Sequence, residues 1–103
     1  MSSGPAPVHL SNNHRDTLLQ LFQHPTSHNV EWHAVVSLLE AVGTVEERRE
    51  GKIHVALGDQ SLFLERPKHK DVSVEQIVEL RRLLAAAGFE QVVNEMEARG
   101  KEV

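Results

Sequence analysis

Two stretches in the first half of the chain carry apolar residues at helical spacing. Between residues 14 and 23, leucine and phenylalanine side chains cluster on one side of a short predicted helix. A second helix is predicted from Val30 to Val42, with Asn29 as its N-cap and Gly43 at its C-terminal end. Its apolar face is formed by Trp32, Val35, Val36, Leu38, Leu39 and Val42.

The periodicity then changes from helical to alternating, which is typical of strands. The predicted strands cover residues 44–50, 52–58 and 61–67. In the middle strand, aliphatic side chains at every second position from Ile53 to Leu57 form one face, which helices are expected to cover. The opposite face carries Lys52, His54 and Phe63 and is expected to meet water or a partner.

A longer amphipathic helix is predicted after the strands. It begins with a capping box, in which Ser73 is the N-cap and Gln76 the third helical residue, and it ends at Gly88. Its apolar face is formed by Val74, Ile77, Val78, Leu80, Leu84 and Ala87. Arg81 lies within this face, where it either extends past its neighbours to water or contacts a phosphate. A shorter helix, residues 89–99, suits an accessory or oligomerisation role.

These elements follow one another in the order α-α-β-β-β-α-α. The order predicts an α+β two-layer fold, in which a three-stranded antiparallel sheet is covered by helices on one face. Residues 1–12 show no periodicity and are expected to form a disordered lead. Residues 13–89 are expected to form a single domain, and residues 90–103 a short C-terminal helix and tail.

Composition narrows the classes of function. The chain has 103 residues and no cysteine, which excludes disulfides and thiolate sites. Its formal net charge of -4 argues against indiscriminate binding of polyanions, although a local basic patch can still bind phosphate. Neither a signal peptide nor a membrane-length apolar run is visible, so a cytoplasmic protein is expected. His24, His28 and His33 are close in sequence but lack a further zinc-type ligand, so no metal or other cofactor is expected.

The basic residues are concentrated immediately before the third predicted helix. Arg66, Lys68, His69 and Lys70 crowd into "ERPKHKD", although a helix N-terminus normally attracts acidic side chains. A phosphate from outside the protein resolves this conflict, because helix N–H groups and the loop cations then converge on one anion. An ordinary polar loop is the alternative, and it remains equally open.

Three segments of the chain together resemble the HicA family of toxins, which are small mRNA interferases with a fold like a double-stranded-RNA-binding domain (dsRBD). The segments are "EWHAVVSLLEAVG", "REGKIHVAL" and "FLERPKHKDVSVEQIVELRRLLAAAGF". The resemblance covers residues 31–89 and implies a metal-independent endoribonuclease that acts on mRNA and is neutralised by a HicB-type antitoxin. The family's catalytic histidine follows glycine and serine directly, whereas here Lys52 and Ile53 follow Gly51, and His54 comes one residue late.

The candidate site residues follow from these patterns. His54 and His69 are the candidate catalytic residues, and Lys52, Arg66, Lys68, Lys70 and Arg81 the candidate phosphate ligands. Phe63 is a candidate for stacking on an RNA base. We expect an RNA-binding domain of a toxin–antitoxin type system whose nuclease activity is weak or lost. The alternative is a non-catalytic module that forms a homodimer or docks a partner protein through the open sheet face or the last helix.

Overall fold

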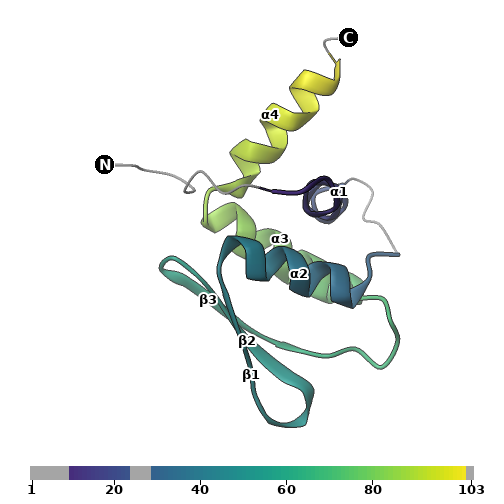
Figure 1. Cartoon of the computed structure of the whole chain (residues 1–103), viewed down its shortest axis with the longest axis vertical. Coiled ribbons are helices and arrows are strands. Elements are labelled where there is room, and N and C mark those ends of the chain that lie inside the picture. The colour runs from purple at the N-terminus through teal and green to yellow at the C-terminus, as the bar shows by residue number, and fades with distance from the viewer. Residues whose placement is uncertain (1–9, 24–28, 102–103) are drawn as a thin grey trace.

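The computed structural model describes residues 10–23 and 29–101, and it shows a sheet with helices packed on one of its faces (Figure 1). The elements are α1 (Asn12–Leu21), α2 (Trp32–Val42), β1 (Thr44–Glu47), a 3-10 turn (Arg49–Gly51), β2 (Lys52–Leu57), β3 (Gln60–Glu65), α3 (Val74–Ala86) and α4 (Phe89–Lys101). The strands form one antiparallel sheet in the order β1-β2-β3. The predicted α+β two-layer fold, with the order α-α-β-β-β-α-α, is therefore confirmed, while the likeness to a dsRBD stays a prediction.

The central strand β2 pairs with both neighbours along an uninterrupted register. His54 lies opposite Glu46 of β1 and opposite Phe63 of β3. Ile53, Val55 and Leu57 are buried on the helix-covered face, as the alternation predicts. Because β2 pairs with β3 residue by residue from Lys52 to Leu57, no bulge turns His54 to the inner face.

All four helices contribute to a single apolar core above the sheet. Leu18 of α1, Leu38 of α2 and Leu80 of α3 are fully buried in it. Phe89 and Val93, at the start of α4, belong to the same cluster. The core therefore includes the first turns of α4, although the rest of this helix extends away from the sheet (Figure 1).

Helix α2 begins two residues later than the sequence predicts, so Asn29 is not its N-cap. Val30 and Glu31 precede the helix instead, and Glu31, whose backbone is extended, occupies the N-cap position. The backbone of this segment pairs with the residues before α3, because the Val72 N–H donates to the Val30 carbonyl at 2.9 Å. Trp32, the first residue of α2, donates its N–H to the Lys70 carbonyl at 2.7 Å. A local pattern cannot reveal this pairing between segments far apart in the chain.

Two further boundaries differ from those that the sequence predicts. Strand β1 ends at Glu47, because the backbone turns at Glu50 and Gly51, whose φ angles are 60° and 76°. Ser11 caps α1, which starts at Asn12, within the predicted disordered lead. The rest of that lead, residues 1–9, lies outside the described residues.

The capping box of α3 is confirmed, but its apolar face is narrower than predicted. The Ser73 Oγ accepts from the Gln76 N–H at 3.1 Å, and the Gln76 Oε1 accepts from the Ser73 N–H at 3.1 Å. Val74 and Val78 were expected in the core, yet they are 43% and 38% exposed. Ile77, Leu80, Leu83 and Leu84 already fill the core-facing side of the helix, so these two valines lie beside it.

Candidate nucleic-acid interface

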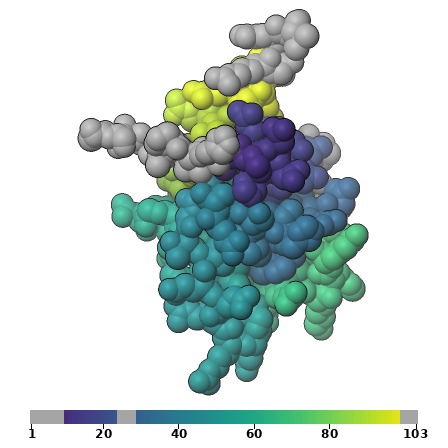
Figure 2. Space-filling model, viewed as in Figure 1, coloured from purple at the N-terminus to yellow at the C-terminus, as the bar shows by residue number. Residues whose placement is uncertain are grey.

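The loop between β3 and α3, residues 66–72, is fastened at both ends. At its start, the Arg66 N–H donates to the Gly51 carbonyl at 2.8 Å, which joins the loop to the turn between β1 and β2. Near its end, the Lys70 carbonyl accepts the first N–H of α2. The turn and the loop consequently project from the same end of the molecule, at the bottom and lower right of the view (Figure 2).

This arrangement gathers positive charge that the sequence places in two separate segments. The basic end, as we call it, consists of Arg48, Arg49, Lys52, Arg66, Lys68 and Lys70. It holds six of the eleven lysines and arginines of a chain whose net charge is -4, and five acidic residues lie in the same two segments: Glu46, Glu47, Glu50, Glu65 and Asp71. The loop cations and Lys52 are candidate ligands from the sequence, whereas Arg48 and Arg49, which the pattern predicts as part of a strand, join them only in the fold.

Several of these cations are not neutralised inside the protein. Within residues 10–23 and 29–101, the side chains of Lys52, Arg66 and Lys68 form no ion pair. The Lys70 Nζ lies 3.8 Å from the Glu31 Oε2, and both groups are accessible to water. An ion pair of this kind is weak and exchanges readily with an incoming anion.

Some of the backbone N–H groups at the start of α3 already have hydrogen-bond partners within the protein. Besides the two bonds of the capping box, the Gln76 Nε2 donates to the Glu65 carbonyl at 2.6 Å. The side chain of Gln76 therefore ties the helix start to the end of β3. The loop cations, rather than the helix N–H groups, are consequently the principal groups that this end offers to a phosphate.

The open face of the sheet carries an aromatic pair. The ring centroids of His54 and Phe63 are 4.6 Å apart, and the rings are tilted by 40°. Phe63 is 63% exposed, so most of its ring remains accessible above the sheet. Lys52 lies on the same face as His54, two residues earlier on β2. One imidazole, one exposed aromatic ring and one cation thus share this surface.

The two candidate catalytic histidines lie in different surroundings. His54 is in the middle of β2 on the open face, whereas His69 is in the β3–α3 loop, next to Lys70, whose carbonyl accepts the first N–H of α2. Ile53, in the position of the family's catalytic histidine, is 6% exposed and faces the core. The histidine of this hairpin is therefore displaced to the opposite face of the sheet.

Arg81 is engaged within the protein and lies apart from the basic end. Its Nε donates to the Leu21 carbonyl at 2.8 Å, and its Nη2 donates to the Gln23 carbonyl at 3.4 Å. Leu21 is the last residue of α1, where a helix carries partial negative charge, and Gln23 follows the C-cap residue Phe22. The guanidinium thus joins α3 to α1, and we leave Arg81 out of the candidate interface.

We expect Arg81→Met to lower the free energy of unfolding by about 1.5–3 kcal/mol, the usual range for hydrogen bonds to a charged group. The substitution keeps an apolar stem but removes both donors. Urea denaturation measures the change, and Arg82→Met, which alters an exposed arginine on the same helix, is the control. Equal stability of the two variants would contradict a structural role for Arg81.

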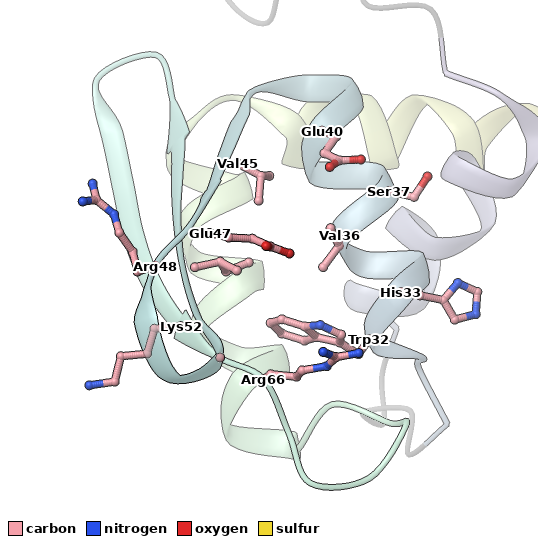
Figure 3. Close-up of a pocket in the computed structure, with 12 residues that line it drawn as sticks. Trp32, His33, Val36, Ser37, Glu40, Val45, Glu47, Arg48, Lys52 and Arg66 are labelled. Carbon is pink, nitrogen blue, oxygen red and sulfur yellow. The ribbon is translucent and has the colours of Figure 1, made fainter.

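A groove between α2 and β1 is a further feature that the sequence did not predict. It has a volume of about 540 Å³ (Figure 3). Its floor is apolar and is formed by Trp32, Val36, Val45 and Ile53. Charged side chains surround the floor, among them Glu40, Glu47 and Arg66. The groove depends on how far α2 stands from the edge strand, a distance that no local pattern encodes.

Comparisons with known proteins give this chain no relatives. No protein-family model matches it, and neither a curated protein nor a solved structure does. Among the described residues, no three His, Asp or Glu side chains are gathered as metal ligands, and no helix is long and apolar enough to cross a membrane. His24 and His28 lie outside the described residues.

Proposed function

We propose that this protein binds RNA through its basic end. The observation that carries the proposal is the convergence of two cation-bearing segments, the β1–β2 turn and the β3–α3 loop, through the bond from Arg66 to Gly51. Cations without internal partners gain most from contact with phosphates, because such contact releases condensed counterions from the RNA. The acidic remainder of the chain restricts this attraction to one end of the molecule.

The open sheet face adds a surface for an unpaired base. Phe63 of β3 presents most of its ring to solvent and lies beside His54 of β2. Lys52 lies on the same face of β2, two residues before His54. Base stacking on an aromatic side chain contributes about 1–3 kcal/mol in proteins that bind single strands. This pairing of an aromatic ring with cations favours single-stranded RNA, such as mRNA, as the bound form.

Any cleavage of RNA by this protein is expected to be weak or absent. General acid–base cleavage requires a histidine beside the reacting phosphate. Ile53 occupies the position that the HicA resemblance assigns to this histidine, and His54 lies in the middle of β2 whereas His69 lies in the β3–α3 loop. The HicA-like assignment and the HicB-type antitoxin partner remain part of this proposal.

The proposal predicts salt-dependent binding of a short RNA. A fluorescently labelled single-stranded oligonucleotide should bind at low salt, and each lost phosphate contact should lower the logarithmic salt slope by about 0.7. We expect Arg66→Ala and Lys68→Ala each to weaken binding and to reduce the slope. Fluorescence anisotropy at several salt concentrations measures both quantities.

The matched control is Arg82→Ala, which removes an exposed arginine of α3 that is not part of the basic end. It should bind RNA as the unmodified protein does. Absence of binding at low salt, or equal loss in all three variants, would rule out the basic end as the interface. In that case the exposed Phe63 favours the alternative, a protein-interaction module or homodimer formed through the open sheet face.

A further inference from the structure

The groove beside α2 borders a strand edge that has no neighbour. Among the residues that the structure describes, strand β1 is the end strand of the sheet and pairs with β2 alone. Such an edge presents unpaired N–H and C=O groups that another extended segment can pair with. Because the groove lies between this edge and α2, an added strand would have an apolar floor for its inward-facing side chains (Figure 3).

The pairing pattern identifies which backbone groups are free. The Arg48 N–H donates to the Lys52 carbonyl at 2.6 Å, so Arg48 directs its backbone groups toward β2. In an antiparallel pair this orientation alternates, and Glu46 therefore also bonds to β2. The N–H and C=O groups of Val45 and Glu47 consequently point outward, while their side chains face the groove.

The charges in the groove specify what fits it. The Glu47 side chain points from β1 toward α2, and Glu40 lies on the α2 side of the same space (Figure 3). Among the described residues neither carboxylate forms an ion pair. Arg48 and Lys52, although they border the groove, direct their side chains away from it (Figure 3). Two unpaired carboxylates therefore face the apolar floor, while the side chain of Arg66 reaches toward Trp32 at one end of the groove (Figure 3).

We infer that the groove binds an extended segment of a partner protein, which adds to the sheet as a fourth strand beside β1. The backbone of the added segment pairs with the outward-pointing N–H and C=O groups of Val45 and Glu47. Its groove-facing side chains alternate between lysine or arginine, opposite Glu47 and Glu40, and an apolar residue over Val36 and Val45. This surface is distinct from the open sheet face and does not depend on RNA binding.

A second copy of this chain is a poorer occupant of the same edge. Strand β1 contains Glu46 and Glu47, so pairing it with another β1 would place four carboxylates on two adjacent strands. Like charges on neighbouring strands are destabilising. A basic segment instead neutralises the acidic edge.

Two readouts on the full chain test this inference. The probe is a synthetic capped peptide, Thr-Lys-Thr-Val-Thr-Lys-Thr, in which the lysines and the valine share one face. The emission of Trp32, the one tryptophan in the sequence, should change with saturation, because its ring lines the groove. By NMR, amide exchange at Val45 and Glu47 should slow at least about tenfold, with no change at Glu46, which is already paired.

Two variants and one altered peptide make the test specific. Glu47→Lys should abolish both signals, whereas Glu46→Lys, the same change on the opposite face of β1, should retain them. A peptide with glutamates in place of its lysines should not bind. Unchanged emission and exchange up to millimolar peptide would overturn the inference, as would protection of the β3 edge instead. Protection of Val45 and Glu47 that appears with protein concentration alone would make a second copy the occupant and overturn the assignment to a partner protein.

Discussion

Gly43→Ala should lower the free energy of unfolding by about 3 kcal/mol or more, at the upper end of the usual cost of overpacking. Gly43 lies between α2 and β1 with φ -161°, an extended conformation that any residue can adopt. The obstacle is space, because a β-carbon there would overlap the Ala56 carbonyl oxygen and the Leu57 Cδ2. Relieving the overlap requires β2 to move, since one of the two atoms belongs to its backbone.

The control for this prediction is Gly58→Ala, in the turn between β2 and β3. Gly58 has a φ of 60°, but a β-carbon at this position would meet no atom within 4 Å. Its expected cost is therefore only the conformational one, about 1–2 kcal/mol. Urea denaturation followed by circular dichroism measures both variants. A Gly43→Ala variant as stable as Gly58→Ala would show that α2 and β2 do not approach each other so closely.

The helices and strands could be predicted from the sequence because each is specified by a pattern of neighbouring residues. Alternation placed Ile53, Val55 and Leu57 on the inner face of β2, and the capping box fixed the start of α3 at Ser73. Gly43 ends α2 as predicted, although the reason lies in its close contact with β2 rather than in helix-end geometry. Local patterns thus specified the elements without specifying the contacts between them.

The features that sequence analysis missed all depend on segments that meet only in the fold. The start of α2 shifts because Val30 pairs with Val72, and Arg81 turns inward because α1 ends beside α3. Similarly, the bond between Arg66 and Gly51 converts two modest clusters of charge into one basic end. The sequence therefore predicts the loop cations and the open sheet face of the candidate interface. It does not predict the contact that brings the loop against the β1–β2 turn.

The concentration of cations before α3 has a structural explanation as well as a functional one. The loop that carries them also holds the start of α2, since Lys70 accepts a hydrogen bond through its carbonyl and its ammonium group lies near Glu31. Its backbone is thus committed to the fold, while the side chains of Arg66 and Lys68 remain exposed. A loop fixed in this way presents its charges with little loss of entropy on binding.

Val72→Asp should destabilise the protein by several kcal/mol, because it places a carboxylate in an apolar site without a partner. Val72 is 4% exposed, and its N–H holds the loop against Val30. Burial raises the pKa of a carboxyl group, so the protonated form is favoured in the folded state. The stability deficit should therefore be larger at pH 7 than near pH 4, since the folded state then binds more protons than the unfolded one.

Val74→Asp provides the matched control for this substitution. Val74 is 43% exposed and is the first residue of α3, where a negative charge interacts favourably with the helix dipole. We expect the free energy of unfolding to change by no more than about 0.5 kcal/mol, as for most surface substitutions.

The milder Val72→Ala is expected to leave the protein folded, and it tests the link to function, because it loosens the loop without removing a charge. Val72→Ala should weaken RNA binding while leaving the number of cations unchanged. An RNA affinity equal to that of the unmodified protein would show that docking of the loop on α2 does not position the basic end.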